Sequence, residues 1–382
     1  MAPALERRRR NVRRDRSVQM AVLAFALFVG LVAGIAGSPR GATASDNADE
    51  QTTARAPRRA VLPARTMLFG HIGLDHRLDL LVAFGWNRGA REGTSLLIPP
   101  TLMVEVPSLG PQALADVPNL ASQRLLEVVV ENALGVDFDA MVLVADTKLA
   151  AVLAPAGTMT IDLSAPTRID DSAGTLSYRA GRHDIEPSEA MRLLTAKGAD
   201  QLSHLVTVGA VLNAWRAALA DRAAADATVH ADQRLLPLAI ARNAKVRNST
   251  LPVERLSSGG EERFRLRPGD AYATVERLLP WALISDAPRP RVEVLNGAGG
   301  VGVTQDVAAM VVPAGGEVTL TGNVPGFGVE ATRVVYYRKQ GAAAAKRLAK
   351  ALGVGSVVRA ASAIDVVDVT IIVGKDFQRH PE

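Results

Sequence analysis

The stretch that decides the fold reads LDLLVAFGWNRGAREGTSLLIPPTLMVEVP and spans residues 78–107. Its first run, Leu78–Phe84, is almost wholly apolar, and its second run, Thr94–Ile98, ends at two prolines. The segment between the runs is rich in glycine and contains an asparagine, residues that tolerate the backbone angles of a turn. Continuous apolar runs bounded by turn residues are typical of strands buried on both faces. The pattern therefore predicts two adjacent strands in the centre of an α/β sheet.

Polar residues flank these two strands at the positions where the sites of α/β proteins usually lie. Arg77 and Asp79 stand at the start of the first strand, and Pro99, Pro100 and Thr101 follow the second. An arginine and an aspartate at a strand end can bind an anion and a cation, or they can form a structural ion pair with each other. The local sequence is compatible with both interpretations.

The first 37 residues differ in composition from the rest of the chain. Residues 1–17 hold seven arginines, and residues 18–37, VQMAVLAFALFVGLVAGIAG, carry no charge. An apolar run of about 20 residues is long enough to cross a bilayer as a helix. Arginines on its N-terminal side place that side in the cytoplasm. We expect a single-pass signal anchor; a cleaved signal peptide is the alternative, although its apolar core is usually shorter.

The remaining chain divides by composition into linkers and two α/β units. Residues 38–65 have no periodic pattern and are expected to form a linker outside the cell. Residues 66–285 carry the strands described above and helical patterns over 122–134 and 200–220, and we expect a polar loop over 165–177. Residues 286–290, DAPRP, read as a second linker. The chain has no cysteine, which excludes disulfides, thiolate metal sites and cysteine nucleophiles.

Residues 291–377 alternate short strands with two helical segments, as a compact α/β unit does. This unit resembles the LytR C-terminal domain. The resemblance rests on VEVLNG at 292–297, NVPGF at 323–327, VVYYR at 334–338, AAAAKRLAKALG at 342–353 and VTIIVGKDF at 369–377.

Residues 67–220 resemble the LytR-CpsA-Psr family. The shared order is an R-x-D strand, an I-P segment, a helix ending in glycine, GVDFDAMVLV at 135–144 and AGRHDIEPSEAM at 180–191. The resemblance implies a membrane-anchored extracellular enzyme of Gram-positive bacteria, here of actinobacterial type. Such enzymes transfer polyprenyl-pyrophosphate-linked glycopolymers onto peptidoglycan, with several arginines around the pyrophosphate and an aspartate on Mg²⁺.

The functional residues of that family are only partly present. The R-S-D motif is retained as Arg77-Leu78-Asp79, but S-I-P-R-D becomes residues 97–101, LIPPT, without its arginine and aspartate. The R-x-R motif becomes Thr195-Ala196-Lys197, and the following helix has no arginine before Arg216. Losing one well-aimed donor commonly costs about 100- to 1000-fold in rate. The remaining candidates are Arg77 and Arg182 for substrate binding and Asp79 for Mg²⁺, with Arg179 and Arg192 as substitutes for the missing arginines.

Four other patterns have a structural interpretation beside a functional one. The glycines at 297, 299 and 302 mimic a dinucleotide fingerprint, but tight-turn geometry explains them better. His71, His76 and Asp75 lie near Asp79, yet strand alternation would place them on both faces rather than around a metal. Asp200, Ser203 and His204 share one helix and cannot form a nucleophile relay at that spacing. The basic helix with Lys346, Arg347 and Lys350 is either a solvated face or a contact for anionic wall polymers.

Together these observations predict a protein of the cell membrane with three parts. They are an N-terminal transmembrane helix, a degenerate LytR-CpsA-Psr-like α/β/α domain and a small C-terminal α/β domain, the last two extracellular. Its expected role is non-catalytic binding of a cell-wall glycopolymer, a lipid-linked precursor or a partner enzyme of the envelope. The alternative is a Mg²⁺-dependent phosphotransferase, for which Mg²⁺ would be the cofactor. A nucleic-acid regulator is disfavoured because the folded domains would lie outside the cell.

Overall fold

The structure is a computed structural model that describes residues 66–87, 92–120, 122–197, 200–225, 245–256, 262–362 and 364–378. The expected cytoplasmic segment, signal anchor and linker at residues 1–65 lie outside these ranges. Within them, no helix combines the length and apolar character that a membrane crossing requires.

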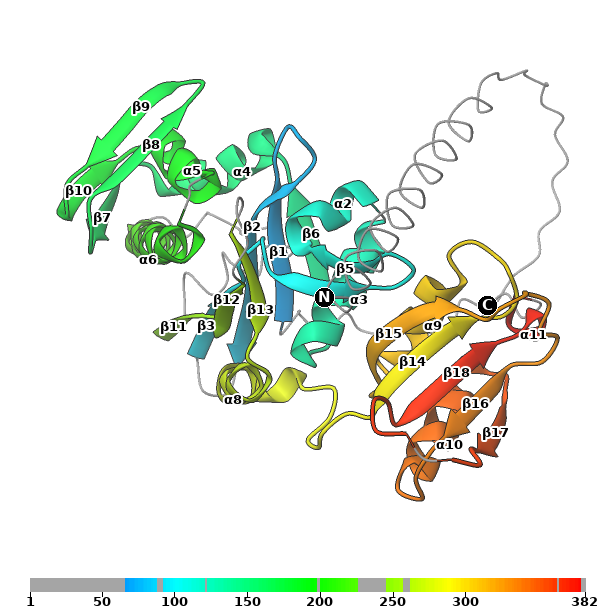
Figure 1. Cartoon of the computed structure of the whole chain (residues 1–382). Helices are drawn as coiled ribbons and strands as arrows, with labels where there is room; N and C mark the ends of the chain where they lie inside the picture. Colours follow the sequence, from blue (N-terminus) through cyan, green and yellow to red (C-terminus); the bar gives the residue numbers. More distant parts are fainter. Residues whose placement is uncertain are drawn as a thin grey trace, which may run out of the picture. The chain divides into compact units, whose positions relative to one another are not determined.

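The centre of the first domain is a mixed five-stranded sheet with the order β11-β3-β2-β1-β6 (Figure 1). Strand β2 is antiparallel to both of its neighbours, β1 and β3, whereas β6 and β11 run parallel to the strands that they pair with. The predicted pair of central strands is therefore confirmed. The five strands are β1 (Thr66–Ile72), β2 (Leu78–Asn87), β3 (Glu92–Leu97), β6 (Ala140–Val144) and β11 (Lys245–Thr250).

Alternate side chains of β2 enter two separate hydrophobic cores. Leu80, Val82 and Phe84 pack with α4 (Asp146–Leu153), α5 (Pro187–Thr195) and α6 (Gln201–Ala225). Leu81 and Ala83 pack on the other face with α3 (Gln123–Leu134) and α8 (Pro268–Leu278). Both faces of the sheet are thus covered by helices, which explains why the sequence of β2 is apolar without alternation.

The end of helix α3 follows its sequence signals. Ser122 caps its N-terminus by accepting a hydrogen bond from the backbone N–H of Leu125. Gly135 ends it in the left-handed conformation with φ of 70°, as the sequence predicts.

One predicted loop was wrong. Residues 165–177 contain most of a hairpin of β8 (Thr167–Asp171) and β9 (Gly174–Tyr178), whose side chains are mostly exposed. A strand pair with little apolar content gives no burial signal in the sequence. The remaining elements of this domain are β4 (Met103–Val106), β5 (Gly110–Ala113), α2 (Val117–Leu120), β7 (Met159–Leu163), β10 (Gly181–Ile185), β12 (Val253–Leu256), β13 (Arg263–Leu266) and three 3₁₀ turns (Leu114–Asp116, Ala154–Ala156 and Pro280–Ala282).

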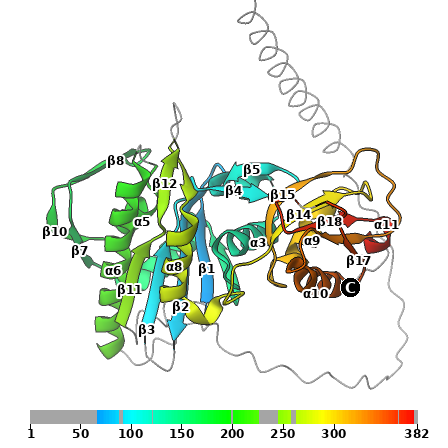
Figure 2. The same ribbon diagram turned by 60° about the horizontal axis from the view of Figure 1, so that its bottom comes forward.

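The C-terminal domain is a five-stranded sheet, ordered β15-β14-β18-β16-β17, with α9 and α10 packed on one face. Figure 2 shows both helices beside this sheet. Gly299 and Gly302 have φ of 89° and 82°, so turn geometry accounts for the glycine motif. The elements are β14 (Arg291–Asn296), α9 (Val303–Val311), β15 (Glu317–Asn323), β16 (Arg333–Tyr336), α10 (Gly341–Leu352), β17 (Ser356–Arg359), β18 (Val369–Val373) and α11 (Lys375–Gln378).

One asparagine of helix α3 forms hydrogen bonds with the backbone of the edge strand β15. The Asn132 side chain donates to the carbonyl oxygen of Val318 and accepts from its backbone N–H, both at 2.8 Å. Arg289 donates to the Asn132 carbonyl oxygen at 2.6 Å. The primary amide of Asn132 therefore satisfies a backbone donor and acceptor that an edge strand would otherwise leave to solvent.

Candidate functional site

The candidate site lies where β1 ends and β2 begins. The register between these strands shifts after His71: His71 pairs with Leu80 and Ile72 pairs with Leu78, so Asp79 is an extra residue in β2. Such a bulge re-aims a side chain. The Asp79 carboxylate occupies space that Gly73 leaves open, because a Cβ at Gly73 would lie 2.5 Å from its Oδ2.

The bulge brings Asp79 to His71, which lies between two carboxylates. His71 Nδ1 is 3.5 Å from Asp79 Oδ2, and His71 Nε2 is 2.9 Å from Asp146 Oδ1. The side chains of His71 and Asp79 are only 1% and 7% exposed. Asp146 arrives because β1 pairs with β6, where His71 is opposite Val144, two residues before Asp146. The sequence interpretation scattered these residues over two faces and missed this arrangement, since it depends on the bulge and on pairing of distant segments.

A lysine supplies the cation nearest to the second oxygen of Asp79. Lys197 Nζ lies 3.6 Å from Asp79 Oδ1 and 2.7 Å from Asp75 Oδ2. The bond from Lys197 lowers the pKa of Asp75. Burial lowers the pKa of Lys197, but its contacts with Asp75 and Asp79 outweigh burial and raise it above its usual value. Lys197 belongs to the Thr195-Ala196-Lys197 segment that the sequence resemblance places at the R-x-R motif.

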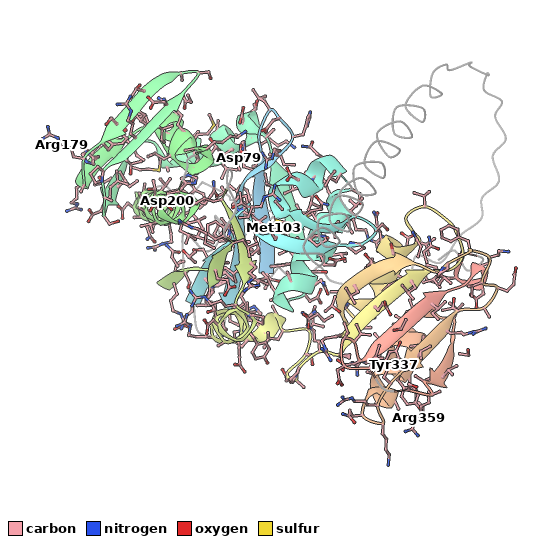
Figure 3. All side chains as sticks on the ribbon, viewed as in Figure 1. Asp79, Met103, Arg179, Asp200, Tyr337 and Arg359 are labelled. Carbon is pink, nitrogen blue, oxygen red and sulfur yellow. The ribbon has the colours of Figure 1, made fainter. Side chains whose placement is uncertain are left out.

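The candidate arginines lie in other ion pairs or away from Asp79. Arg77 Nε is 2.8 Å from Asp116 Oδ1, so the ion pair that the structure gives Arg77 is not with Asp79. Arg192 Nε contacts Asp171 at 2.8 Å. Two further candidates, Arg179 and Arg182, are exposed at and just before β10, and Figure 3 shows Arg179 well away from Asp79.

The segment Pro99–Thr101, which the sequence resemblance places at S-I-P-R-D, is part of the core. Pro99, Pro100 and Thr101 are all buried. The carbonyl oxygen of Pro100 accepts from Ala115 N–H, and that of Thr101 accepts from Phe264 N–H at 3.3 Å. Their backbone thus fixes β2 and β3 to the neighbouring turn and to β13. No side chain of this segment is available to contact a pyrophosphate.

At the start of helix α6 lies the second set of polar candidates, Asp200, Ser203 and His204. Ser203 Oγ donates to Asp200 Oδ2 at 2.6 Å within the same helical turn. His204 Nε2 lies 2.9 Å from the carbonyl oxygen of Leu193, and burial lowers the pKa of its imidazole. The histidine therefore interacts with backbone and not with Ser203, and the three residues form no relay, as the sequence predicts.

A groove of about 890 Å³ lies over helix α6. Its walls come from β7, β8 and the end of β11, and Leu97 of β3 reaches it. Hydroxyl and amide side chains dominate its polar lining, and the partly buried Arg216 has an Nε atom without a hydrogen-bond partner among the described residues. One end of the groove reaches Asp200 and His204. The negative charge of Asp79 opposes the effect of burial on the pKa of His204. The polar residues are Thr160, Asp162, Ser164, Thr167, Arg168, Asp200, Ser203, His204, Thr207, Asn213, Arg216, Asn248, Ser249 and Thr250.

The Asp79 cluster as built does not fit Mg²⁺. A Mg²⁺ ion needs oxygen ligands from carboxylates, water or phosphate. The two oxygens of Asp79 face His71 and Lys197, and a cationic lysine at 3.6 Å competes with a metal ion. Over the described ranges, no group of three or more His, Asp or Glu side chains is arranged to hold a metal ion.

Comparison with known proteins identifies the C-terminal domain. Residues 289–377 match the family model described as "LytR cell envelope-related transcriptional attenuator", so this part of the chain is a LytR C-terminal domain. The search of curated proteins gives no match.

The chain is also structurally similar to proteins of the LytR-CpsA-Psr family. Bacillus subtilis TagV shares 14% identity over 57% of this chain and 97% of its own, with a TM-score of 0.46. The LytR-Csp2A-Psr enzyme from Actinomyces oris shares 15% over 58% and 92%, with a TM-score of 0.46. YwtF (TagT), a LytR-CPS2A-psr family protein with bound octaprenyl pyrophosphate lipid, shares 15% over 60% and 93%, with a TM-score of 0.44.

Proposed function

We propose that this chain is a cell-envelope protein that binds a glycopolymer or its lipid-linked precursor without transferring it. In this proposal residues 66–285 form the LytR-CpsA-Psr-like domain and residues 291–377 the C-terminal domain, joined by residues 286–290. Residues 1–17 remain cytoplasmic, residues 18–37 anchor the chain in the membrane, and residues 38–65 separate it from the folded domains. The observation that carries the proposal is that both oxygens of the Asp79 carboxylate already face partners within the chain, His71 and Lys197.

The charge balance around Asp79 argues against pyrophosphate chemistry. A transferring phosphoryl group spreads negative charge over several oxygens, and catalysis depends on preorganised cations aimed at them. Lys197 is the cation whose ion pair with Asp79 the structure shows, and it also binds Asp75. Arg77 and Arg192 are directed to Asp116 and Asp171. With two or more guanidinium donors engaged elsewhere, the expected rate loss is on the order of 10⁴-fold or more.

The groove over α6 supports binding instead. Its hydroxyl and amide groups can donate to and accept from sugar hydroxyls. Several lining positions are small or apolar, among them Val206, which is 54% exposed, and Ala210. A volume of several hundred Å³ lies within the range of known ligand sites. Arg182 lies opposite Asp162, a lining residue, in the β10–β7 pair, and is the proposed anion contact at that rim.

The test measures binding and chemistry with one ligand. The full-length chain in detergent is mixed with a fluorescent polyprenyl-pyrophosphate-linked oligosaccharide and Mg²⁺, and both anisotropy and phosphate release are followed. We expect binding without phosphate release. Val206→Trp should weaken binding about 10-fold or more by filling the groove, whereas Val301→Trp, at a valine that is 100% exposed in the C-terminal domain, should not.

The alternative, a Mg²⁺-dependent phosphotransferase, draws on one observation. Lys197 retains a positive charge beside Asp79, and both lie at positions of family motifs. Phosphate release that requires Mg²⁺ and disappears in Asp79→Asn would establish this alternative and refute the non-catalytic proposal. Release that persists in Asp79→Asn would instead indicate a contaminating phosphatase.

A further inference from the structure

The C-terminal domain carries a continuous basic segment. Residues 333–359 contain seven lysines and arginines and no aspartate or glutamate. They form β16, α10 and β17, the part of the domain at the far edge of its sheet from β15. Figure 3 shows Arg359 at this edge. The seven cations are Arg333, Arg338, Lys339, Lys346, Arg347, Lys350 and Arg359, all of them exposed.

Most of these charges have no carboxylate partner. Within the described part of the chain, the ion pair of this segment is Arg338 with Asp365. Arg347 Nε donates to the carbonyl oxygen of Ala314 at 2.8 Å, which fixes the side chain but leaves its charge uncompensated. The remaining five cations are exposed to solvent, and their like charges repel one another. They are Arg333, Lys339, Lys346, Lys350 and Arg359.

The fold gives no reason for this concentration. Lys346 and Lys350 are one helical turn apart, where like charges repel and destabilise a helix. The helix dipole favours Lys350, which stands in the last turn of α10. The same dipole disfavours Lys339, which stands just before the first turn. The dipole of α10 thus favours Lys350 at one end of the helix and disfavours Lys339 at the other. Helix stability therefore does not explain why both are lysines, and a ligand explains it better.

The arrangement fits an extended anion rather than a bilayer. The cations of helix α10, Lys346, Arg347 and Lys350, cover about 6 Å of its axis, and Arg333 and Arg359 extend the basic surface over β16 and β17. Membrane-surface helices place large apolar side chains beside their cations. The large apolar residues of α10, Leu348 and Leu352, are buried in the domain core, and Ala343 is its exposed apolar residue. We propose that α10, with β16 and β17, binds a linear polymer that carries a phosphate group in each repeat.

The experiment uses the full-length chain with inorganic polyphosphate as the probe. The triple variant Lys346→Ala/Lys350→Ala/Arg359→Ala should raise the dissociation constant about 10-fold or more. It should also reduce the slope of log K against log salt by about 2, because fewer counterions are released. The matched control removes three exposed cations of the first domain, Arg124→Ala/Lys148→Ala/Arg277→Ala, and should retain wild-type affinity.

Two further arms keep the inference falsifiable. Neutral dextran should not bind, and vesicles with phosphatidylglycerol should bind more weakly than polyphosphate at equal phosphate concentration. Equal loss of polyphosphate binding in both triple variants would show a non-specific charge effect and overturn the proposal. Stronger binding to vesicles than to polyphosphate would overturn it in favour of a lipid surface. Circular dichroism establishes that both variants are folded, and neither arm depends on the groove over α6.

Discussion

The two folded domains place their charges differently. Around Asp79 the charged groups are mutually paired: His71 lies between two carboxylates, and Lys197 bridges Asp75 and Asp79. In the basic segment at residues 333–359 the cations are exposed, and six of the seven have no carboxylate partner in the described chain and can meet a ligand. A charge engaged by internal partners stabilises the fold and is a poor donor to a ligand, since binding would first break the internal pair. An exposed, unpaired charge contributes little to stability and responds to any anion.

Removal of Asp79 tests this contrast and is expected to have the largest effect on stability. Asp79→Ala removes a nearly buried carboxylate and leaves His71 with Asp146 and Lys197 with Asp75 as their remaining partners, and we expect it to cost about 3 kcal/mol of the free energy of unfolding. Urea denaturation measures it. As the control, Asp170→Ala removes an exposed pair with Arg168 and should lower the free energy of unfolding far less, because solvent screens an exposed pair. Equal costs for both variants would show that the Asp79 cluster is not a stabilising unit.

The second test concerns Glu131, a buried carboxyl in α3. Burial raises its pKa from 4.5 to about 7, against the opposing effect of a hydrogen bond from Phe138 N–H. Because the folded state holds the proton more tightly than the unfolded state, this group's stabilisation is full below pH 4.5. It is lost as pH rises towards 7, by up to about 3 kcal/mol. Glu131→Gln should remove that slope in denaturation series across this pH range; an unchanged slope would assign it elsewhere.

The third test lies at the contact between the domains. Asn132→Ala leaves a buried N–H and C=O of Val318 without their partner and should cost about 2 kcal/mol. The loss should appear in thermal unfolding of the full-length chain. Asn119→Ala is a suitable control, because its side chain makes an exposed hydrogen bond with the carbonyl oxygen of Asp75. A loss in Asn132→Ala no greater than in the control would mean that the contact is not formed in solution.

The smallest expected effect is on the basic segment. Lys346→Ala/Lys350→Ala should leave the free energy of unfolding unchanged within about 0.5 kcal/mol, because both residues are exposed and repel each other. Denaturation at low and at moderate salt measures this, and the small difference should shrink with salt. A loss of 2 kcal/mol or more would show that these lysines have structural partners and would remove the contrast with Asp79.

Local patterns predicted much of the fold. The apolar run of β2 identified a strand with both faces covered, and Gly135 identified the end of α3. The glycines at 299 and 302 were correctly assigned to turns. These features depend on a few neighbouring residues, so a short stretch of sequence contains the physical information. The β8–β9 hairpin was missed because its exposed strands lack that apolar signal.

The candidate site was less predictable because its members come from distant segments. Asp79 was identified from its motif, but its contact with His71 needs the bulge in β2, and Asp146 arrives only through the parallel pairing of β1 with β6. Lys197 was not among the candidates from the sequence, where it stood only in the segment that lacks the R-x-R motif, and its reach to Asp79 depends on the packing of α5. Roles for Arg77, Arg182 and Asp79 in ligand binding remain predictions.

The amide of Asn132 has a consequence for assembly. It occupies a backbone donor and acceptor on β15, one of the two outer strands of the C-terminal sheet. A strand from another molecule would have to displace it before pairing there. The opposite outer strand, β17, has a free edge but carries Arg359, whose charge repels a second copy of itself. Growth of this sheet from chain to chain is thus blocked by a side chain on one flank and by like charge on the other.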